Sequence, residues 1–180
     1  VEALTNTALE EDFEVAFVPD GWQQESTGNY TWSYENTVGG FGQSTNSMFV
    51  NNYVISQAGT FCDIIAPLNM QNTDAADATL TFDVAYALYS SAYEDGLEVE
   101  VSTDCGMTWT NVYSKYGSVL ATAPNTTAQF VPTATQWREE SIDLTSYVGN
   151  ENVQIKFRNC LLYTSPSPRD AHESRMPSSA

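Results

Sequence analysis

The stretch TLTFDVAYALY, residues 79–89, alternates between apolar and polar or small side chains. Every second residue from Leu80 to Leu88 is apolar or aromatic, whereas Thr81 and Asp83 lie between them. A β-strand places alternate side chains on opposite faces of a sheet. The stretch therefore predicts a strand with one buried face and one exposed face.

The same period of two occurs at two other places, residues 97–101 and residues 153–157. In the first of these, Glu98 and Glu100 fall between apolar residues, so we expect their carboxylates to face water. A single turn at Leu144–Val148 is the strongest helical signal, and it is far shorter than an ordinary helix. Strands without intervening helices predict a two-sheet sandwich or jelly roll.

Length and charge limit the classes of protein to consider. A chain of 180 residues forms one domain with a full core, and no apolar run approaches the roughly 20 residues that cross a bilayer. Because 23 acidic residues face 6 basic ones, for a net charge of −17, nucleic acid would be repelled. The carboxylates either stay solvated or coordinate a hard cation such as calcium. Cys62, Cys105 and Cys160 indicate neither a disulfide framework nor a zinc site, although one pair stays open.

The alternation stops at Cys160 and gives way to a segment rich in Ser and Pro. We predict a linker at 1–8, one domain at 9–159 and a non-native or disordered tail at 160–180. The letters CLLYTSPSPRD resemble the translation of sequencing-adaptor read-through, which predicts that the native domain is cut off after Asn159. The chain begins at Val1 without an export signal, so we expect it to come from a longer protein with flanking domains.

One turn motif has the pattern S-x-D-x-G-x-T-W, which is similar to the Asp-box turn of sialidase-like propellers. Its residues are Ser102, Asp104, Gly106, Thr108 and Trp109. We expect Asp104 to bind backbone amides of the turn, Gly106 to adopt positive φ and the Trp109 ring to pack beneath the hairpin. This interpretation is structural rather than catalytic.

Aromatic residues give the better functional signal, and Tyr89 and Tyr93 are the candidates for ligand binding. Flat rings with polar tips stack on sugars or anchor protein partners, although packing between strands is the alternative role. Catalysis is not expected. The single histidine, His172, lies in the tail, which excludes Ser-His-Asp, Cys-His and HExxH mechanisms, and no pattern marks a glycosidase cleft.

Four segments resemble the choice-of-anchor J family. They are DFE…PDGW, TFCDIIAPLNM, ATLTFDVAYALYS…YEDGLEVEVSTDCGMTWTNVYSK and WREESIDLTSYVGNENVQIKFRN, which together span Leu9 to Asn159. The family is similar to the cleaved-adhesin modules of gingipain-type proteases and, more distantly, to MAM domains. The resemblance implies a jelly-roll β-sandwich of two antiparallel sheets, found in secreted or surface-anchored bacterial proteins that bind extracellular proteins or glycans.

The resemblance also implies a structural calcium ion, with Glu14 and Asp63 at the matching positions and Asp95, near the strand that contains Leu97, as a further candidate ligand. Family members continue with a final strand of the type LYLDNI, which this chain lacks. We therefore expect the last native strand to be missing and a sheet edge or central gap to be left unpaired. The predicted function is a non-catalytic extracellular adhesion or interaction module; the alternative is a carbohydrate-binding module attached to a secreted hydrolase or protease.

Overall fold

The computed structural model describes residues 9–15, 17–36 and 44–162, and regular structure within them is almost entirely β. The strands are β1 (Gln23–Ser26), β2 (Ser33–Glu35), β3 (Ser47–Phe49), β4 (Phe61–Leu68), β5 (Thr79–Val84), β6 (Asp95–Ser102), β7 (Thr110–Tyr116), β8 (Arg138–Asp143) and β9 (Val153–Leu161). The helical pieces are α1 (Gly117–Leu120) and the 3-10 turns η1 (Asn52–Val54), η2 (Ala75–Asp77), η3 (Ala134–Gln136) and η4 (Thr145–Tyr147). The predicted all-β fold class is confirmed. The predicted linker at 1–8, His172 and the tail from residue 163 lie outside the described residues.

One layer is a five-stranded antiparallel sheet in the order β1-β4-β9-β6-β7. Its central strand, β9, continues past the predicted boundary at Asn159. Cys160 pairs with Phe61 and Gly96, and Leu161, which is fully buried, pairs with Asp95. The strand runs on because residue 161 is again apolar and falls on the inward-facing side, so the folded region ends later than the change in composition suggested.

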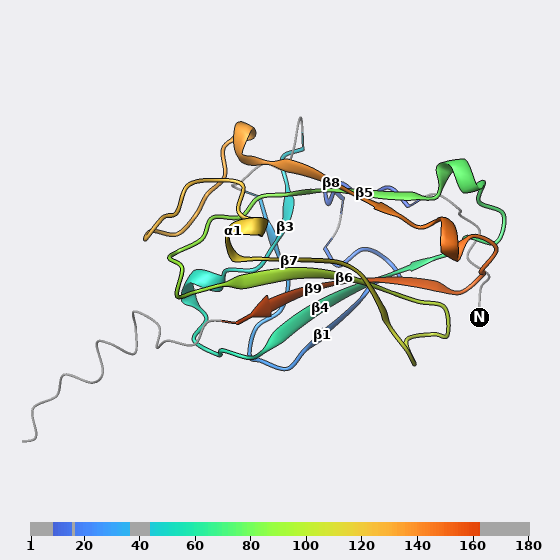
Figure 1. The fold of residues 1–180 in the computed structure, drawn as a ribbon, viewed down its shortest axis with the longest axis horizontal. Helices are drawn as coiled ribbons and strands as arrows, with labels where there is room; N and C mark the ends of the chain where they lie inside the picture. Colours follow the sequence, from blue (N-terminus) through green and yellow to red (C-terminus); the bar gives the residue numbers. More distant parts are fainter. Residues whose placement is uncertain (1–8, 16, 37–43, 163–180) are drawn as a thin grey trace, which may run out of the picture.

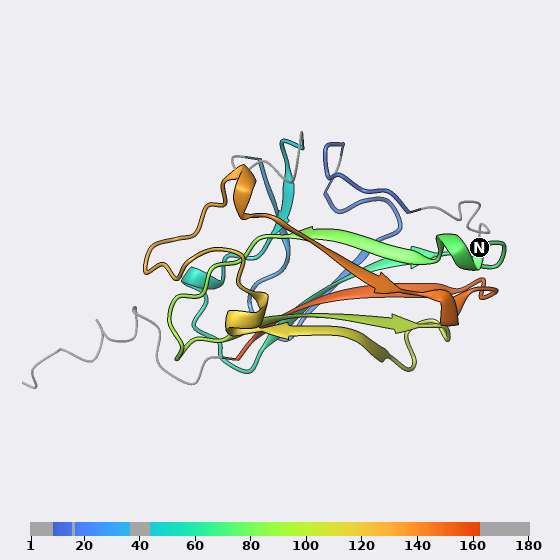
Figure 2. The ribbon, with the colours of Figure 1, turned by 45° about the horizontal axis from the view of Figure 1, so that its top comes forward.

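The other layer consists of separate pairs of strands rather than one continuous sheet. β5 pairs with β8, and β2 pairs with β3, each as a two-stranded antiparallel sheet. Figure 1 shows β5 and β8 lying above the five-stranded sheet, and the turned view in Figure 2 keeps them as a distinct layer. In the described part of the chain, β3 and β5 therefore each have one strand neighbour.

The core fills the space between the layers with every second residue of the large sheet. Its buried members from that sheet are Ile64, Leu68, Val99, Val101, Val153, Ile155 and Phe157. From the opposite layer, Leu80 and Phe82 of β5 pack against this cluster while staying half-buried. The period of two read from the sequence thus places the same side chains inward in the fold, because a strand packed on one face must bury that face.

The outward face of the large sheet is less exposed to solvent than the sequence predicted. Glu100 lies 2.5 Å from the ammonium of Lys156, and Glu98 accepts a short hydrogen bond from the hydroxyl of Tyr116. Both carboxylates are half-buried rather than solvated. The prediction was wrong because β9 lies beside β6 and brings its two basic side chains, Lys156 and Arg158, to the same face.

Two further expectations concern the ends of strands and the cysteines. The strand predicted over 79–89 ends at Val84. The rest of the predicted stretch, residues 85–89, contributes only an isolated parallel bridge between Ala87 and Ala123. All three cysteines are free thiols, so the pairing left open does not form. Among the described residues, no helix is long and apolar enough to cross a membrane.

Candidate functional site

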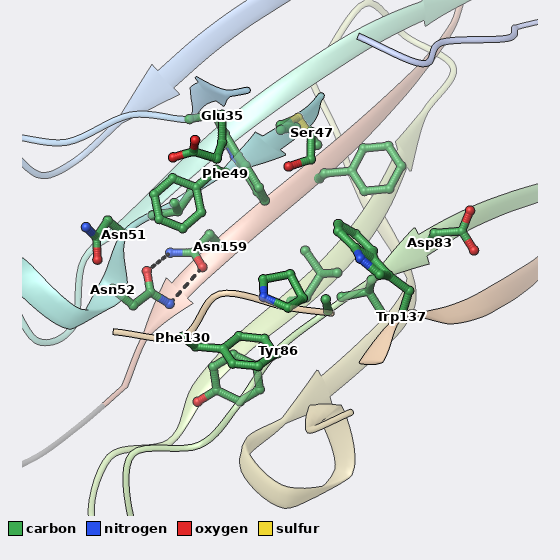
Figure 3. A pocket seen from close by; sticks show the side chains of 18 of the residues that line it. Glu35, Ser47, Phe49, Asn51, Asn52, Asp83, Tyr86, Phe130, Trp137 and Asn159 are labelled. Atoms are coloured by element: carbon green, nitrogen blue, oxygen red, sulfur yellow. Dashed lines mark hydrogen bonds between the residues drawn. The ribbon is translucent and has the colours of Figure 1, made fainter. Parts of the chain in front are cut away.

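A cavity of about 540 Å³ opens between β3 and β5. Its floor is formed by inward-facing side chains of the large sheet, including Phe157 and Asn159 of β9. Figure 3 shows Phe49 on one side of this space and Tyr86 and Phe130 on the other, with Asn159 between them. The lining is mainly apolar and aromatic, which is the usual character of a site that takes a ligand in proteins.

The two tyrosines predicted to bind a ligand meet at this cavity. Tyr89 and Tyr93 both line it, and their rings contact edge to face with centroids 5.2 Å apart. Tyr53, from the 3-10 turn η1, joins them with its ring centroid 6.4 Å from that of Tyr89. These rings keep part of their surface exposed, since Tyr89 and Tyr93 are half-buried and Tyr53 is 45% exposed. An aromatic cluster of this kind provides contact area at a low entropy cost.

Polar groups lie within the same cavity, next to the tyrosines. Asn52 and Asn159 donate to each other's side-chain oxygens, both at 3.1 Å, and Figure 3 shows this reciprocal pair. Asp95 also lines the cavity; burial raises its pKa to about 6, and a hydrogen bond from Asn52 only partly offsets the effect. One carboxylate oxygen of Asp95 is buried without a hydrogen-bond partner in the part of the chain that the structure describes, and so is the indole N–H of Trp137.

These polar groups matter because a buried group without a partner costs free energy in the empty protein. A ligand that offers a donor to Asp95 and an acceptor to Trp137 would recover that cost on binding. The sequence contained a signal for Asn159, another polar residue of the cavity, that the prediction did not use. Asn159 continues the inward phase of Val153, Ile155 and Phe157, so a polar amide stands where the pattern calls for a core residue.

Among the described residues, every charged side chain that lines the cavity is acidic. The set consists of Glu11, Asp12, Glu35, Asp83 and Asp95. Asp83 lies opposite Glu139 of β8 in the strand register, and burial together with that neighbouring carboxylate raises the pKa of Asp83. The cavity is therefore a region of negative potential, which favours neutral or cationic ligand groups over anionic ones.

The structure does not bring the three predicted calcium ligands together. Asp63 is buried on the outward side of β4, where both of its oxygens accept hydrogen bonds from the guanidinium of Arg158 at 2.8 Å. Asp95 lies in the cavity described above. Glu14 lies in the segment before β1 and accepts bonds from Ser44, Thr45 and Asn46.

Calcium requires six to eight oxygen ligands around one point. Glu14 and Asp63 already direct both carboxylate oxygens to protein donors, and the hydrogen bonds, led by that from the Thr45 hydroxyl, hold the pKa of Glu14 at about 2. Within the described residues, no group of three or more His, Cys, Asp or Glu side chains could hold a metal ion. The three carboxylates therefore do not fit one shared calcium site, and calcium itself stays a prediction.

The turn predicted from the S-x-D-x-G-x-T-W pattern connects β6 to β7. Asp104 accepts from the Thr108 hydroxyl at 2.6 Å, from the Thr108 amide at 2.9 Å and from the Ser102 hydroxyl at 2.7 Å. Gly106 has a φ of +82°, a conformation that glycine adopts without strain. The Trp109 ring lies under the Lys156 ammonium at 3.9 Å. These contacts hold the hairpin and face away from the cavity, since none of the five residues lines it.

Comparison with known proteins identifies the fold. The chain is similar to the K1 cleaved adhesin domain of Lys-gingipain from Porphyromonas gingivalis W83, with a TM-score of 0.53 and 17% identity over 79% of this chain and 88% of that chain. It is also similar to a carbohydrate-binding module of the β-sandwich superfamily, with a TM-score of 0.49 and 11% identity over 85% of this chain and 55% of that one. The Endo-D glycoside hydrolase domain from Streptococcus pneumoniae R6 has a TM-score of 0.38 and 20% identity over 79% of this chain and 20% of its own.

No protein-family model matches the chain, and no curated protein matches it. At these identities, the likeness to the adhesin domain shows a shared all-β sandwich fold. The choice-of-anchor J and MAM resemblances stay predictions.

Proposed function

We propose that this chain is a non-catalytic adhesion or interaction module, which binds its partner at the cavity between β3 and β5. One observation carries the proposal: the cavity combines an aromatic wall with two buried polar atoms, Asp95 Oδ1 and Trp137 Nε1, that have no hydrogen-bond partner among the described residues. Unsatisfied buried groups are rare in native proteins and require a reason, and a ligand that pairs with them is one.

The chemistry of the cavity favours recognition over catalysis. Asp95 accepts a hydrogen bond from the amide of Asn52, which also pairs with the amide of Asn159, and Tyr86 interacts with Asp95 as well. Amides donate and accept hydrogen bonds but do not exchange protons near neutral pH. A raised carboxylate pKa alone marks a candidate functional site rather than a reaction. Amides and tyrosines around a carboxylate are a set suited to orienting a bound partner.

The fold supports the same proposal. The similar domain of Lys-gingipain is an adhesin domain, and an acidic β-sandwich of this kind suits a module on the surface of a larger extracellular protein. We therefore infer an extracellular or bacterial cell-surface location, with other domains of a longer parent protein beside it.

A carbohydrate-binding module is the second candidate, and the tyrosine cluster favours it. Tyr53, Tyr89 and Tyr93 could stack on a sugar ring while Asp95 and the asparagine pair bind its hydroxyl groups. The acidic lining makes a neutral sugar the expected ligand under this alternative, because a uronate or sulfate group would be repelled.

Binding to two panels tests the proposal: immobilised extracellular matrix proteins and a glycan array. Wild type should bind saturably to a member of at least one panel, and Tyr89→Ala should weaken that binding by about tenfold or more. Tyr34→Ala is the matched control, because Tyr34 is exposed on β2 and does not line the cavity. Circular dichroism and thermal unfolding confirm that each variant is folded.

The two candidates give different outcomes. Binding confined to the protein panel supports the adhesion module, whereas binding confined to the glycans supports the second candidate. Silence on both panels, or binding that Tyr89→Ala leaves unchanged, would overturn the placement of the site in this cavity.

A further inference from the structure

The tyrosine end of the cavity is built at one end of the sandwich. Tyr53 lies in η1, and Tyr89 and Tyr93 lie in the segment between β5 and β6. Asp95 begins β6, where it pairs with Leu161 of the central strand β9. Figure 1 shows η1, in cyan, and the light-green segment that leads into β6 at the same end of the molecule. None of these residues belongs to β3 or β5, so other elements set the geometry of this end.

The carboxylate of Asp95 is connected to the rings through Asn52. A side-chain hydrogen bond links Asn52 to Asp95, and Tyr53 is the next residue of η1. The ring of Tyr53 in turn lies beside that of Tyr89. Asp95 is only 8% exposed, and one of its oxygens has no hydrogen-bond partner among the described residues. A carboxylate with spare acceptor capacity at a cavity wall is suited to a donor that a ligand brings.

Every basic side chain that the structure describes is ion-paired away from the cavity. The four pairs are Lys115–Glu140, Arg138–Glu140, Lys156–Glu100 and Arg158–Asp63. None of the four basic residues lines the cavity. A buried aspartate is rare without a charged partner, because burial removes the water that solvates its charge. Among the described residues, Asp95 therefore has no cationic partner, and a ligand can supply one.

Two properties of the tyrosine end favour a cationic group over a neutral donor. A hydrogen bond from a charged donor to a carboxylate is roughly twice as strong as one between neutral groups. The face of a tyrosine ring attracts a cation that lies within about 6 Å of the ring centre. The chain contains the same combination elsewhere, since the Lys156 ammonium lies 3.9 Å from the centre of the Trp109 ring and 2.5 Å from Glu100. A carboxylate beside aromatic rings is therefore suited to an ammonium or guanidinium group.

The burial of Asp95 also limits the shape of the cation. Because Asp95 is only 8% exposed, a group that pairs with it must enter on a narrow stem. Lysine and arginine carry their charge at the end of an unbranched chain of methylenes, which can pack along aromatic surface. An amino group on a sugar ring brings the whole ring with it, so the geometry favours a protein side chain.

We propose that the tyrosine end of the cavity binds a lysine or arginine side chain of a partner protein. Asp95 is the counter-ion, held in place by Asn52. The rings of Tyr53, Tyr89 and Tyr93 line the methylene stem. The ionised carboxylate, which is costly in the empty protein, gains a charged partner on binding. The inference rests on the proposed function, because it names the chemical group that the partner inserts into that same cavity.

Four small probes test this chemistry in an NMR titration of the full chain. They are lysine and arginine blocked at both ends of the backbone, the blocked lysine with its ε-amine acetylated, and glucosamine. Blocked lysine or blocked arginine should shift the backbone amides of residues 52–53 and 89–95 saturably, with a dissociation constant on the order of millimolar. Acetylated lysine keeps the stem without the charge, so it should bind at least about tenfold more weakly.

Two variants each remove one negative charge from the cavity lining. Asp95→Asn should weaken the binding of blocked lysine by about tenfold or more, because the counter-ion is lost. Asp83→Asn is the matched control: Asp83 also lines the cavity but is exposed on β5, and its loss should leave the affinity within about twofold. Circular dichroism and thermal unfolding check that both variants are folded.

The affinity should also depend on pH in one direction. Burial raises the pKa of Asp95 to about 6, so the carboxylate is mostly protonated at pH 5 and ionised at pH 7.5. The titratable groups that interact with Asp95, the phenols of Tyr30 and Tyr86, have pKa values raised by burial and stay protonated throughout. Blocked lysine should therefore bind about tenfold more tightly at pH 7.5 than at pH 5.

Each contrary result decides against the inference in a different way. Equal binding of acetylated lysine would refute the need for a charge, and binding that Asp95→Asn leaves unchanged would refute the counter-ion. Tighter binding of glucosamine than of either blocked amino acid would overturn the protein side chain in favour of an amino sugar. Failure of all four probes together with Tyr89-dependent binding on either panel would overturn the cation and leave the proposed function standing.

Discussion

Replacing Asp95 with asparagine should stabilise the protein at neutral pH and lose part of that benefit in mild acid. Burial raises the pKa of Asp95 from 3.8 to about 6. Because the pKa in the folded state lies above that in the unfolded state, the folded protein binds the proton more tightly. The stability contributed by this difference is fully present below the unfolded pKa and is lost as the pH rises through about 6.

The size of the effect follows from the shift in pKa. At 1.36 kcal/mol per pH unit, ionised Asp95 costs roughly 3 kcal/mol at neutral pH relative to a protein in which it is protonated. Between pH 7.5 and pH 5 the linkage relation recovers about 1.4 kcal/mol of this. The range stops at pH 5 because the protein approaches its isoelectric point of about 4.1 below it.

Urea unfolding at several pH values between 7.5 and 5 measures the difference in unfolding free energy between Asp95→Asn and wild type. We expect this difference to shift by about 1.4 kcal/mol against the variant as the pH falls. Its absolute value at pH 7.5 also includes about 1 kcal/mol or more for the amide that replaces the carboxylate, so the slope is the sharper observable. Glu25→Gln removes the same charge from the exposed face of β1 and controls for net charge. A difference that stays constant with pH would refute the assignment of Asp95 as a buried, partly unsatisfied carboxylate.

Two further predictions concern groups outside the cavity. Asp63→Asn should cost about 3 kcal/mol in urea unfolding, because it leaves Arg158 without its bidentate partner, and the loss should be the same in calcium and in chelator; a loss seen only in calcium would make Asp63 a metal ligand after all. Asp104→Ala should lower the urea midpoint at pH 7, because hydrogen bonds led by that from the Thr108 hydroxyl hold the pKa of Asp104 at about 2. That stability is present above the unfolded pKa and is lost as the pH falls through about 2, so the gap to wild type should narrow in acid, and a constant gap would contradict the turn geometry.

The sequence was sufficient to predict which side chains of the strands face the core. Val99, Ile155 and Leu80 alternate with polar residues, and burial of one face requires that pattern whatever the neighbouring strand is. The same pattern could not show which strands are neighbours. Asp63 and Arg158 are 95 residues apart, and they meet only because β4 and β9 are adjacent in a particular register.

That missing information bears on two expectations about carboxylates, of which the calcium-ligand set stays a prediction. Glu98 and Glu100 were expected in water, and Asp63 was placed with Glu14 and Asp95 in one ligand set. Each of these expectations assigns a role to a carboxylate whose neighbour on the adjacent strand cannot be identified from the sequence. Once β9 is known to lie between β4 and β6, its basic residues Lys156 and Arg158 become the partners of Glu100 and Asp63.

The tyrosines were predictable for a different reason. Tyr89 and Tyr93 follow the strand β5 within one short segment, so their proximity needs no knowledge of register. The third ring, Tyr53, lies in a turn between β3 and β4 and could be placed beside them only by the fold. Local clusters can be read from a sequence, whereas sites assembled from distant segments cannot.

Asp95 and Asn159 connect these observations to the proposed site. Asp95 shares the inward phase of Leu97, Val99 and Val101, and Asn159 shares that of Phe157, so both polar residues stand at positions that their strands otherwise fill with apolar side chains. An apolar residue at either position would remove a buried polar group and its cost. Sequences tend to break local rules of this kind at functional sites and to compensate elsewhere in the fold. Both exceptions line the same cavity, at its tyrosine end, and this is why we assign the binding site there rather than to the ion-paired acidic residues on the opposite face of the sheet.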